Sequence, residues 1–282
     1  MGILRRHPLT TFFVLAVAAT WAVWIPRALG APVGVLGDLW TWTVAIVAVA
    51  VAALTGGRVA VRELFSRLVR WRVGWRWYVV AVVGPAAFAL LTAAVFTAFG
   101  GVPPGGLLAA LPRTDWVLLP VLVLAAALTD GLGEELGWRG FALPRLLARQ
   151  TPLTAGIVLG VLWAAWHLPL LWTPGRVLHQ HPFWLFLLDI VAKSLFMTWV
   201  FLRTRGSVLI AVLLHAGLNV FAFPAGVPGA DGLLLPVLTV ALDWVVVAVV
   251  IWWARPTFTR PVHDPEVLPW PHGPPEGVEA RT

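Results

Sequence analysis

The stretch G133-E-E-L-G-W-R-G140 places two carboxylates and a guanidinium, Glu134, Glu135 and Arg139, in sequence that is otherwise almost free of charge. Long apolar segments flank it on both sides. Further along the chain, polar residues interrupt two more apolar segments, at W163-A-A-W-H167 and at H215-A-G-L-N219. We expect these three patches to meet in space, and the rest of the chain to be the scaffold that brings them together.

Composition defines the class of protein. Of the 282 residues, 60% are hydrophobic and 12% are charged, and the mean hydropathy is +0.86. A soluble domain has about twice that charged fraction. The apolar residues occur in runs of about 20, which is the length that crosses the hydrocarbon core of a bilayer as a helix. Because backbone polar groups inside lipid must be paired within their own segment, we predict an all-α, polytopic membrane protein.

Eight transmembrane helices are predicted from these runs. They cover 8–26, 32–54, 78–99, a fourth span from 116 through the glutamate pair, 152–172, 183–202, 208–223 and 233–254. Between the second and third spans, residues 57–76 alternate arginines with apolar residues at helical spacing. This pattern predicts an amphipathic helix on the cytoplasmic face of the membrane. A cleaved signal peptide is the alternative for the first run, but the run is long for that purpose and further spans follow.

The placement of arginine orients the spans. If both termini are cytoplasmic, 15 arginines fall in inner segments, while the outer segments hold Arg27, Arg113 and Arg176. This asymmetry follows the positive-inside rule, so the net charge of +7 points to anionic lipid and not to nucleic acid. The composition is typical of a bacterial chain, for which the plasma membrane is the expected location. Residues 1–254 are expected to form a single integral membrane domain, and the Pro-rich, polar residues 255–282 a disordered tail.

The polar patches are predicted to lie at similar depths. Glu134 precedes Arg145 by 11 residues, which corresponds to about 16 Å from the inner surface at a rise of ~1.5 Å per residue. By the same estimate His215 lies about 15 Å deep, Asn219 about 21 Å and His167 about 22 Å. All four fall near the middle of a hydrocarbon core of about 30 Å. An ionisable group costs roughly 2.5–3.5 kcal/mol at that depth, so their convergence indicates a functional site.

Helical spacing indicates how these side chains pair. Glu135 and Arg139 are four residues apart, so they share a helix face and are expected to form an ion pair. Glu134 points about 100° away and takes no part in that pair, which leaves it available as a general base. His215 and Asn219 are also four residues apart. They could present an imidazole and an amide to one point, as an oxyanion clamp or as donors that orient a water.

Structural explanations stand beside this catalytic one. A glutamate pair near a helix end is commonly solvated or capping, and a histidine in a membrane helix commonly holds neighbouring helices together through hydrogen bonds. The shared depth of the patches favours a site, to which His167 adds a second imidazole from a third helix.

The three patches, E134-E-x-x-x-R139, W-x-x-x-H167 and H-x-x-x-N219, resemble the motif signature of the CPBP intramembrane proteases. That family includes the CAAX prenyl endopeptidases of the Rce1 type and the bacterial Abi proteins linked to bacteriocin self-immunity. The resemblance covers about residues 116–225, and the order and spacing of the motifs match. Trp163 stands where the family usually has Phe, which we interpret as a swap of one aromatic residue for another.

The resemblance implies an endopeptidase that hydrolyses a peptide or protein substrate at the membrane. Glu134 would activate the hydrolytic water, and His215 with Asn219 would stabilise the oxyanion. The implied catalytic residues are Glu134, Glu135, Arg139, His167, His215 and Asn219.

Participation of a metal stays open at this stage. If a Zn²⁺ ion takes part, its ligands would be Glu134, His167 and His215. The chain has no HExxH motif, however, and a glutamate–histidine site without metal fits the same residues and is slightly favoured. No other cofactor is expected.

Two other classes of function remain as alternatives. Asp189 and Lys193, four residues apart in the sixth span, are expected to neutralise each other, whereas Asp243 in the eighth span has no obvious partner. Together these residues could belong to a proton-coupled transporter. Inverted repeats of broken helices, which transporters commonly have, are not visible in the sequence. The other alternative is a non-catalytic immunity protein or partner-binding membrane protein. His179 and His181 fall in a predicted outer loop, too far from the site to join it.

Overall fold

The computed structural model describes residues 6–34, 39–101, 117–174, 182–222 and 232–262, and in these ranges the secondary structure is helical. Six helical segments of the described residues are long and apolar enough to cross a membrane. They are α2 (Pro8–Ala28), α3 (Trp42–Leu68), α4 (Trp75–Ala98), Pro152–Trp172, α11 (Phe183–Arg203) and α13 (Leu234–Trp253). The prediction of an all-α, polytopic membrane protein is therefore confirmed for this part of the chain, with six long spans where eight were expected.

The other two predicted spans are present as helices of a different kind. The seventh is α12 (Val208–Phe221), which is apolar but shorter than the six. The fourth is a helical run divided into segments of different pitch, described below. The histidines at 179 and 181 lie outside the described residues.

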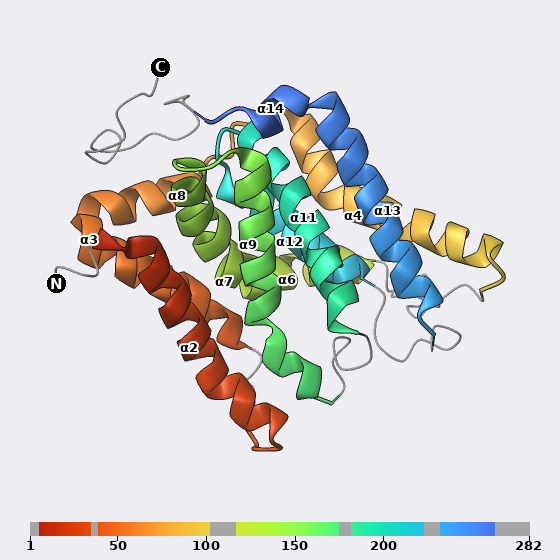
Figure 1. Cartoon of the computed structure of the whole chain (residues 1–282), viewed down its shortest axis with the longest axis horizontal. Helices are drawn as coiled ribbons and strands as arrows, with labels where there is room; N and C mark the ends of the chain where they lie inside the picture. Colours follow the sequence, from red (N-terminus) through yellow and green to blue (C-terminus); the bar gives the residue numbers. More distant parts are fainter. Residues whose placement is uncertain (1–5, 35–38, 102–116, 175–181, 223–231, 263–282) are drawn as a thin grey trace.

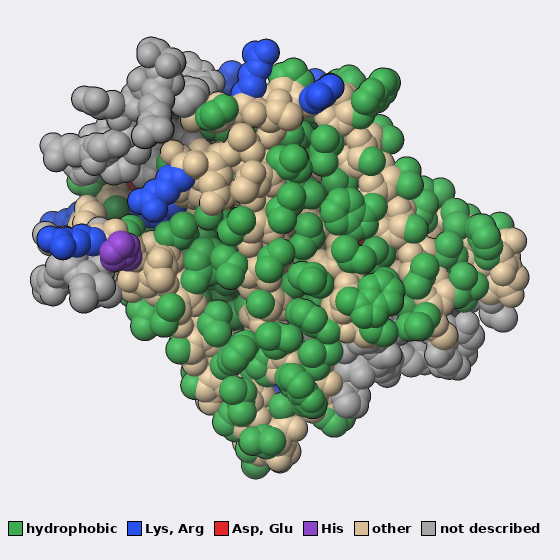
Figure 2. Space-filling view, viewed as in Figure 1, with side chains coloured by type: hydrophobic (Ala, Val, Ile, Leu, Met, Phe, Trp, Pro, Cys, Tyr) green, Lys and Arg blue, Asp and Glu red, His purple; other side chains and the backbone are tan. Residues whose placement is uncertain are grey.

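The surface of the molecule is apolar over large areas. Val14, Ile46, Val121 and Val245 are each more than half exposed, and Trp252 is 80% exposed. Figure 2 shows hydrophobic side chains spread over the whole of one face, with lysine and arginine side chains near its edge. Contiguous apolar surface of this extent is a surface for lipid rather than for water.

The helices pack around a centre formed by α9 (Pro152–Trp166), α11 and α12 (Figure 1). The helix α9 packs along α11, and α12 packs along α4. On one side α2 packs against α3, and on the other α13 packs against α11 and α4. Segments far apart in the sequence are thereby brought against the fourth predicted span.

That fourth span is a continuous helical run from 119 to 147. It consists of α6 (Leu119–Ala126), the π-helical segment η4 (Ala127–Gly131), α7 (Leu132–Glu135), the π-helical segment η5 (Leu136–Ala142) and α8 (Leu143–Leu147). The glutamates thus lie in a short α-helical segment between two π-helical ones. π-Helical turns are rare and are found frequently at functional sites. The helix continues well past the glutamate pair, as its apolar sequence predicted.

Glycines let two pairs of helices approach closely. A Cβ atom at Gly137 would lie 3.0 Å from the carbonyl oxygen of Val44 in α3, so a side chain there has no room. On α9, a Cβ atom at Gly160 would lie 2.8 Å from the Cα of Val191 in α11. Small residues at such contacts are the usual means of packing helices within a membrane, where burial of apolar surface provides no driving force between them.

The helix α3 bends sharply at Gly57, whose φ of 62° and ψ of −153° are not helical. The part after the bend carries the arginines that predicted an amphipathic helix, and Arg58 and Arg62 are exposed there. Arg67 differs from that expectation because it is only 4% exposed. Its guanidinium pairs with Glu63 at 2.9 Å and lies over the ring of Phe201.

The helical domain continues beyond residue 254. Arg255–Thr259 forms the short helix α14, and Phe258 within it is completely buried. The disordered tail was expected to begin at 255, so the structure extends the folded part by at least this turn. Residues 263–282 lie outside the described residues.

Candidate active site

A buried ion pair forms the base of the candidate site. The Arg139 Nη1 donates to Glu135 Oε1 at 2.8 Å, and both side chains are completely buried. The pairing expected from their spacing is therefore present. Glu135 Oε1 also lies 2.7 Å from Nδ1 of His215, which comes from α12. One carboxylate oxygen thus joins the fourth span to α12 at the level of the glutamates.

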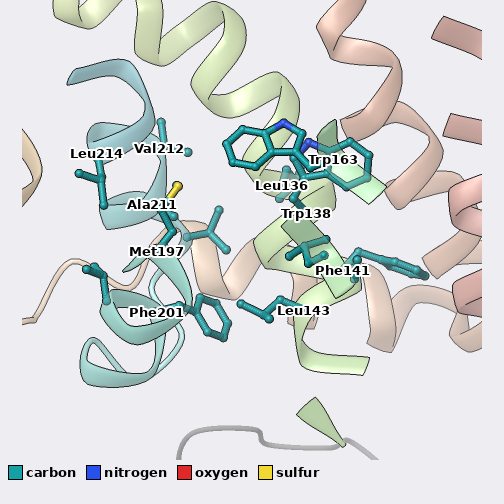
Figure 3. Packing of buried hydrophobic residues seen from close by; sticks show 14 of the residues in the cluster. Leu136, Trp138, Phe141, Leu143, Trp163, Met197, Phe201, Ala211, Val212 and Leu214 are labelled. Atoms are coloured by element: carbon teal, nitrogen blue, oxygen red, sulfur yellow. The ribbon is translucent and has the colours of Figure 1, made fainter. Parts of the chain in front are cut away.

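Glu134 has two partners that were not expected, of which one lies four residues further along the same helix. Its Oε2 accepts hydrogen bonds from the indole N–H of Trp163 at 2.7 Å and from that of Trp138 at 3.2 Å. Both tryptophans belong to the buried hydrophobic core (Figure 3). Glu134 is 3% exposed, so these donors replace water around one of its oxygens. The expectation that Glu134 would be left unengaged is correct for Arg139 but not for the site as a whole.

The second oxygen of Glu134 faces His215. The distance from Oε1 to His215 Nε2 is 4.0 Å, which is longer than a direct hydrogen bond. Polar groups at such a separation are commonly joined by a water molecule. Because Glu135 fixes the orientation of the ring through Nδ1, His215 directs Nε2 towards Glu134.

His167 lies within the apolar span 152–172, where the α-helix changes to a 3₁₀ helix. It is the C-cap of α9, and a 3₁₀ segment, η6 (Leu168–Trp172), follows it. Its Nδ1 lies 2.9 Å from the carbonyl oxygen of Trp163. Aromatic side chains surround the imidazole ring with centroids 4.6–6.2 Å away, namely those of Trp24, Trp163, Trp166 and Phe186.

The metal alternative can be compared with this geometry. Among the described residues, no group of three or more His, Asp or Glu side chains is placed to hold a metal ion. Glu134 and His215 approach each other, but His167 forms no such group with them. The three residues that were expected as zinc ligands therefore do not fit that role in this arrangement, and we derive no step through a metal.

Asn219 is engaged by a residue that the sequence reasoning missed. Its Nδ2 donates to Oδ2 of Asp130 at 3.3 Å, and the Asn219 side chain is exposed. Asp130 lies in the π-helical segment η4, four residues before Glu134. The spacing Asp130-x-x-x-Glu134 was available in the sequence and is the same signal that paired Glu135 with Arg139.

The contacts between the fourth span and α12 therefore form two levels. Glu134 faces His215 at the inner level, and Asp130 contacts Asn219 one turn further along each helix. Exposure rises from the inner level to the outer one, since His215 is 4% exposed whereas Asn219 is exposed. His215 and Asn219 thus do not point to one spot in this structure, but they line the same side of α12 facing the fourth span.

Three further charged residues of the spans form a separate cluster. Lys193 pairs with Asp189 on α11, and its Nζ lies 3.8 Å from Oδ2 of Asp243 on α13. The pairing of Asp189 with Lys193 was expected from their spacing. Asp243, which lacked an obvious partner in the sequence, is drawn to the same lysine.

Fold and site together define a polytopic helical membrane protein with a buried glutamate–histidine centre between two helices. Residues 115–221 match the type II CAAX prenyl endopeptidase family described as Rce1-like. Over this segment the chain is similar to that family, which is a family of peptidases, and the resemblance drawn from the three motifs is confirmed. All six residues of the expected catalytic set, together with Asp130, fall in the matched segment.

A particular relative also matches part of the chain. The protein called CAAX prenyl protease 2 from Methanococcus maripaludis is 33% identical to this chain over 112 residues. The matched region covers 38% of this chain and 40% of that protein. The helices α2, α3, α4 and α13, which surround the site, lie outside the segment that matches the family.

Proposed function

We propose that the protein is an intramembrane endopeptidase that hydrolyses a peptide bond of a membrane-associated peptide or protein with a water activated by Glu134. This proposal depends on one observation: Glu134 Oε1 and His215 Nε2 face each other at a distance of 4.0 Å inside an apolar protein. The peptidase family of the matched segment supports the same reaction class.

The residues divide the chemistry among them. Glu134 takes a proton from the water at Oε1, and the resulting hydroxide attacks the substrate carbonyl. His215, held through Nδ1 by Glu135, positions that water with Nε2. Arg139 balances the charge of Glu135, so the orienting carboxylate remains fixed at full burial. Asn219 lies one turn outward, where it can donate to the carbonyl oxygen as negative charge develops. Glu134 then returns its proton to the leaving amine.

We infer a role for His167 in lining the substrate cavity and positioning the reacting groups. Its ring lies beside Trp163, which also contacts Glu134, so it belongs to the same surroundings without touching the glutamate. This role needs no metal ligand at 167.

The proposal includes a location and an orientation. The protein lies in a bacterial plasma membrane with eight spans, the short α12 and the divided fourth helix included, and with both termini cytoplasmic. The arginine asymmetry of the sequence and the exposed arginines after the bend in α3 support this orientation. The relative's printed name suggests a prenylated peptide ending in a CaaX sequence as the first substrate to test.

The decisive experiment is proteolysis by the purified protein in detergent or liposomes. Wild type and Glu134→Gln are compared on a panel of peptides that contains a farnesylated CaaX peptide and its unmodified form, each with and without a chelator. Glu134→Gln keeps the size of the side chain and the acceptor for the indoles but cannot take a proton. We expect it to fold and to lose at least about a hundredfold in rate, as removal of a general base does.

The outcomes separate the alternatives. Full hydrolysis by Glu134→Gln would refute the catalytic assignment. A non-catalytic immunity or partner-binding protein would show no hydrolysis by wild type and would keep its biological effect in Glu134→Gln. Loss of activity with chelator, restored by Zn²⁺, would show that a metal takes part after all.

A further inference from the structure

We propose that Trp163 is a positioning residue for Glu134: its indole N–H holds Oε2 and thereby leaves Oε1 as the oxygen that receives the proton of the water. This inference rests on the proposed function, because it concerns how the same glutamate acts. It assigns to the Trp of the second motif a task that the aromatic ring of a Phe cannot perform.

The contacts of Trp163 connect the separate parts of the site. Its Nε1 donates to Glu134 Oε2 at 2.7 Å, the shorter of the two indole bonds to that oxygen. The guanidinium of Arg139 lies over its ring, 4.5 Å from the centroid. The ring centroid of His215 lies 5.5 Å away, and the carbonyl oxygen of Trp163 lies 2.9 Å from Nδ1 of His167. A residue that is 4% exposed thus touches four of the expected site residues.

The chemistry of the indole explains why this contact matters. An indole N–H is a donor and has no acceptor, unlike the hydroxyl or imidazole groups that commonly bind carboxylates. Glu134 Oε2 accepts two such donors, from Trp163 and Trp138, so a proton placed on Oε2 would face two N–H groups and lose both bonds. The proton is therefore directed to Oε1, the oxygen that faces His215.

The ring also sets the position of the carboxylate. Arg139 over the ring face and the ring of His215 beside it restrict the movement of the indole. A short hydrogen bond from a fixed donor then restricts the rotation of the Glu134 carboxylate. Small displacements of a catalytic group lower the rate strongly without comparable effect on substrate binding.

The first test uses kinetics with the peptide substrate that wild type hydrolyses best. Trp163→Phe keeps an aromatic ring but removes the donor, and we expect kcat to fall by about tenfold to a hundredfold, the range for a hydrogen bond to a charged group. KM should stay within about twofold, since Glu134 acts on the water and not on substrate binding. Trp138→Phe, which removes the longer bond, should lower kcat less.

The matched control is Trp40→Phe. The Trp40 indole also donates at 2.7 Å, but to the carbonyl oxygen of Ala19 and not to a residue of the proposed catalytic set. Loss of this hydrogen bond in Trp40→Phe should leave kcat unchanged. If Trp163→Phe and Trp40→Phe have equal kcat, or if Trp163→Phe raises KM while kcat stays the same, the positioning role is wrong.

A second test reads the hydrogen bond without requiring activity. The 18 tryptophans of the chain each give one indole N–H signal in NMR spectra of protein labelled with ¹⁵N-tryptophan. Glu134→Gln replaces a charged acceptor by a neutral one, so the signals of Trp163 and Trp138 should move upfield while the other signals move little. Trp163→Phe identifies the first of them by its disappearance.

This pair of tests keeps the two proposals distinguishable. Shifted indole signals in a protein that hydrolyses no peptide would support the contact and refute the peptidase function. An active peptidase in which Glu134→Gln moves neither signal would refute the role of Trp163 and leave the catalytic role of Glu134 intact. Should Trp163→Phe fail to fold, the comparison of wild type with Glu134→Gln still decides the contact.

Discussion

Glu134 and Glu135 are neighbours with the same side chain and different tasks, because their surroundings differ. Glu135 Oε1 binds a guanidinium and an imidazole and is completely buried. Glu134 has indole donors on one oxygen and a more distant imidazole opposite the other. The first arrangement fixes a charge in place, whereas the second leaves one oxygen free to exchange a proton. The difference arises from the roughly 100° between adjacent residues of a helix.

The contact between Asp130 and Asn219 should act as one unit. If Asp130 orients the Asn219 amide towards the substrate carbonyl, then replacing either residue by Ala removes the same function. We expect each single variant to lower kcat/KM, and the double variant to lower it little further. The coupling energy should be about 0.5–1.5 kcal/mol, as for one hydrogen bond. A double-mutant cycle measured on the same peptide substrate checks this.

Additive losses in that cycle would mean that the two residues act independently. Asp243→Ala provides the control, since Asp243 belongs to the separate cluster with Lys193. Its effect on kcat/KM should add to that of Asn219→Ala without coupling.

At the scale of single residues, the sequence predicts contacts within one helix better than contacts between helices. Glu135 with Arg139 and Asp189 with Lys193 follow from spacing of four residues. The bond from His215 to Glu135 joins residues 80 positions apart, so no local rule contains it. Trp163 was interpreted as an aromatic swap because sequence spacing does not show which way an indole N–H points. Because its indole N–H donates to Glu134, the replacement of Phe by Trp adds a hydrogen-bond donor as well as a different ring.

At the scale of the element, the fourth span depends on close contact with α3. The glycine at 137 lies against the α3 backbone at Val44, and α3 packs on both α7 and η5. This contact fixes the helix that carries both glutamates. The glycines of the quoted stretch therefore have a packing role beside the catalytic one of the acids.

Gly137→Ala is expected to destabilise the protein. The added Cβ would lie 3.0 Å from the Val44 carbonyl oxygen and 3.1 Å from Cζ of Phe12, so the helices must separate. Overpacking of this kind costs about 1–3 kcal/mol. Thermal unfolding in detergent measures the loss. Gly84→Ala on α4 is the control, because nothing lies within 4 Å of a Cβ at that position and no loss is expected.

An unchanged melting temperature in Gly137→Ala, or an equal decrease in Gly84→Ala, would contradict this account. Val44→Ala combined with Gly137→Ala should recover part of the stability, since it removes the Cγ atoms that the new methyl group meets.

The sequence predicts helix bounds well where helix-breaking residues mark the ends of an apolar run. The bounds of the predicted run 152–172 agree with the structure. Its last five residues form a 3₁₀ segment, which was not predicted. The start of α3 was placed ten residues too early, since apolar residues 32–41 do not distinguish a helix from a loop. The π-helical segments could not be predicted at all. Local propensity carries no signal for them.

At the scale of the whole molecule, a family segment is enclosed by further helices. The match ends at residue 221, and α13 follows it. A polar contact in this outer layer is the approach of Asp243 to Lys193, which joins α13 to α11 of the matched segment. That cluster was the basis of the transporter alternative. Because the cluster lies between packed helices, it can equally hold α13 against α11. We therefore expect Asp243→Asn to lower the thermal stability of the protein more than its rate of proteolysis.

The proposed orientation can be tested with single cysteines, because the chain has none. Ala31 and Arg149 are both exposed and are placed on opposite sides of the membrane by the arginine rule. In intact spheroplasts, a membrane-impermeant maleimide should label Ala31→Cys. Arg149→Cys should react only after permeabilisation. The reverse pattern would place the termini outside.

The division of the fourth span into π and α segments makes the effect of chain length depend on position. A π turn holds more residues than an α turn, so loss of one residue from 127–131 would let that turn become α-helical while the flanking helix keeps nearly its present facing. Loss of one residue from the α-helical segment that follows, at Leu132 or Gly133, would instead rotate Asp130 and Glu134 by about 100° relative to each other. The two acids would then no longer face α12 together, although every residue of the three motifs remained.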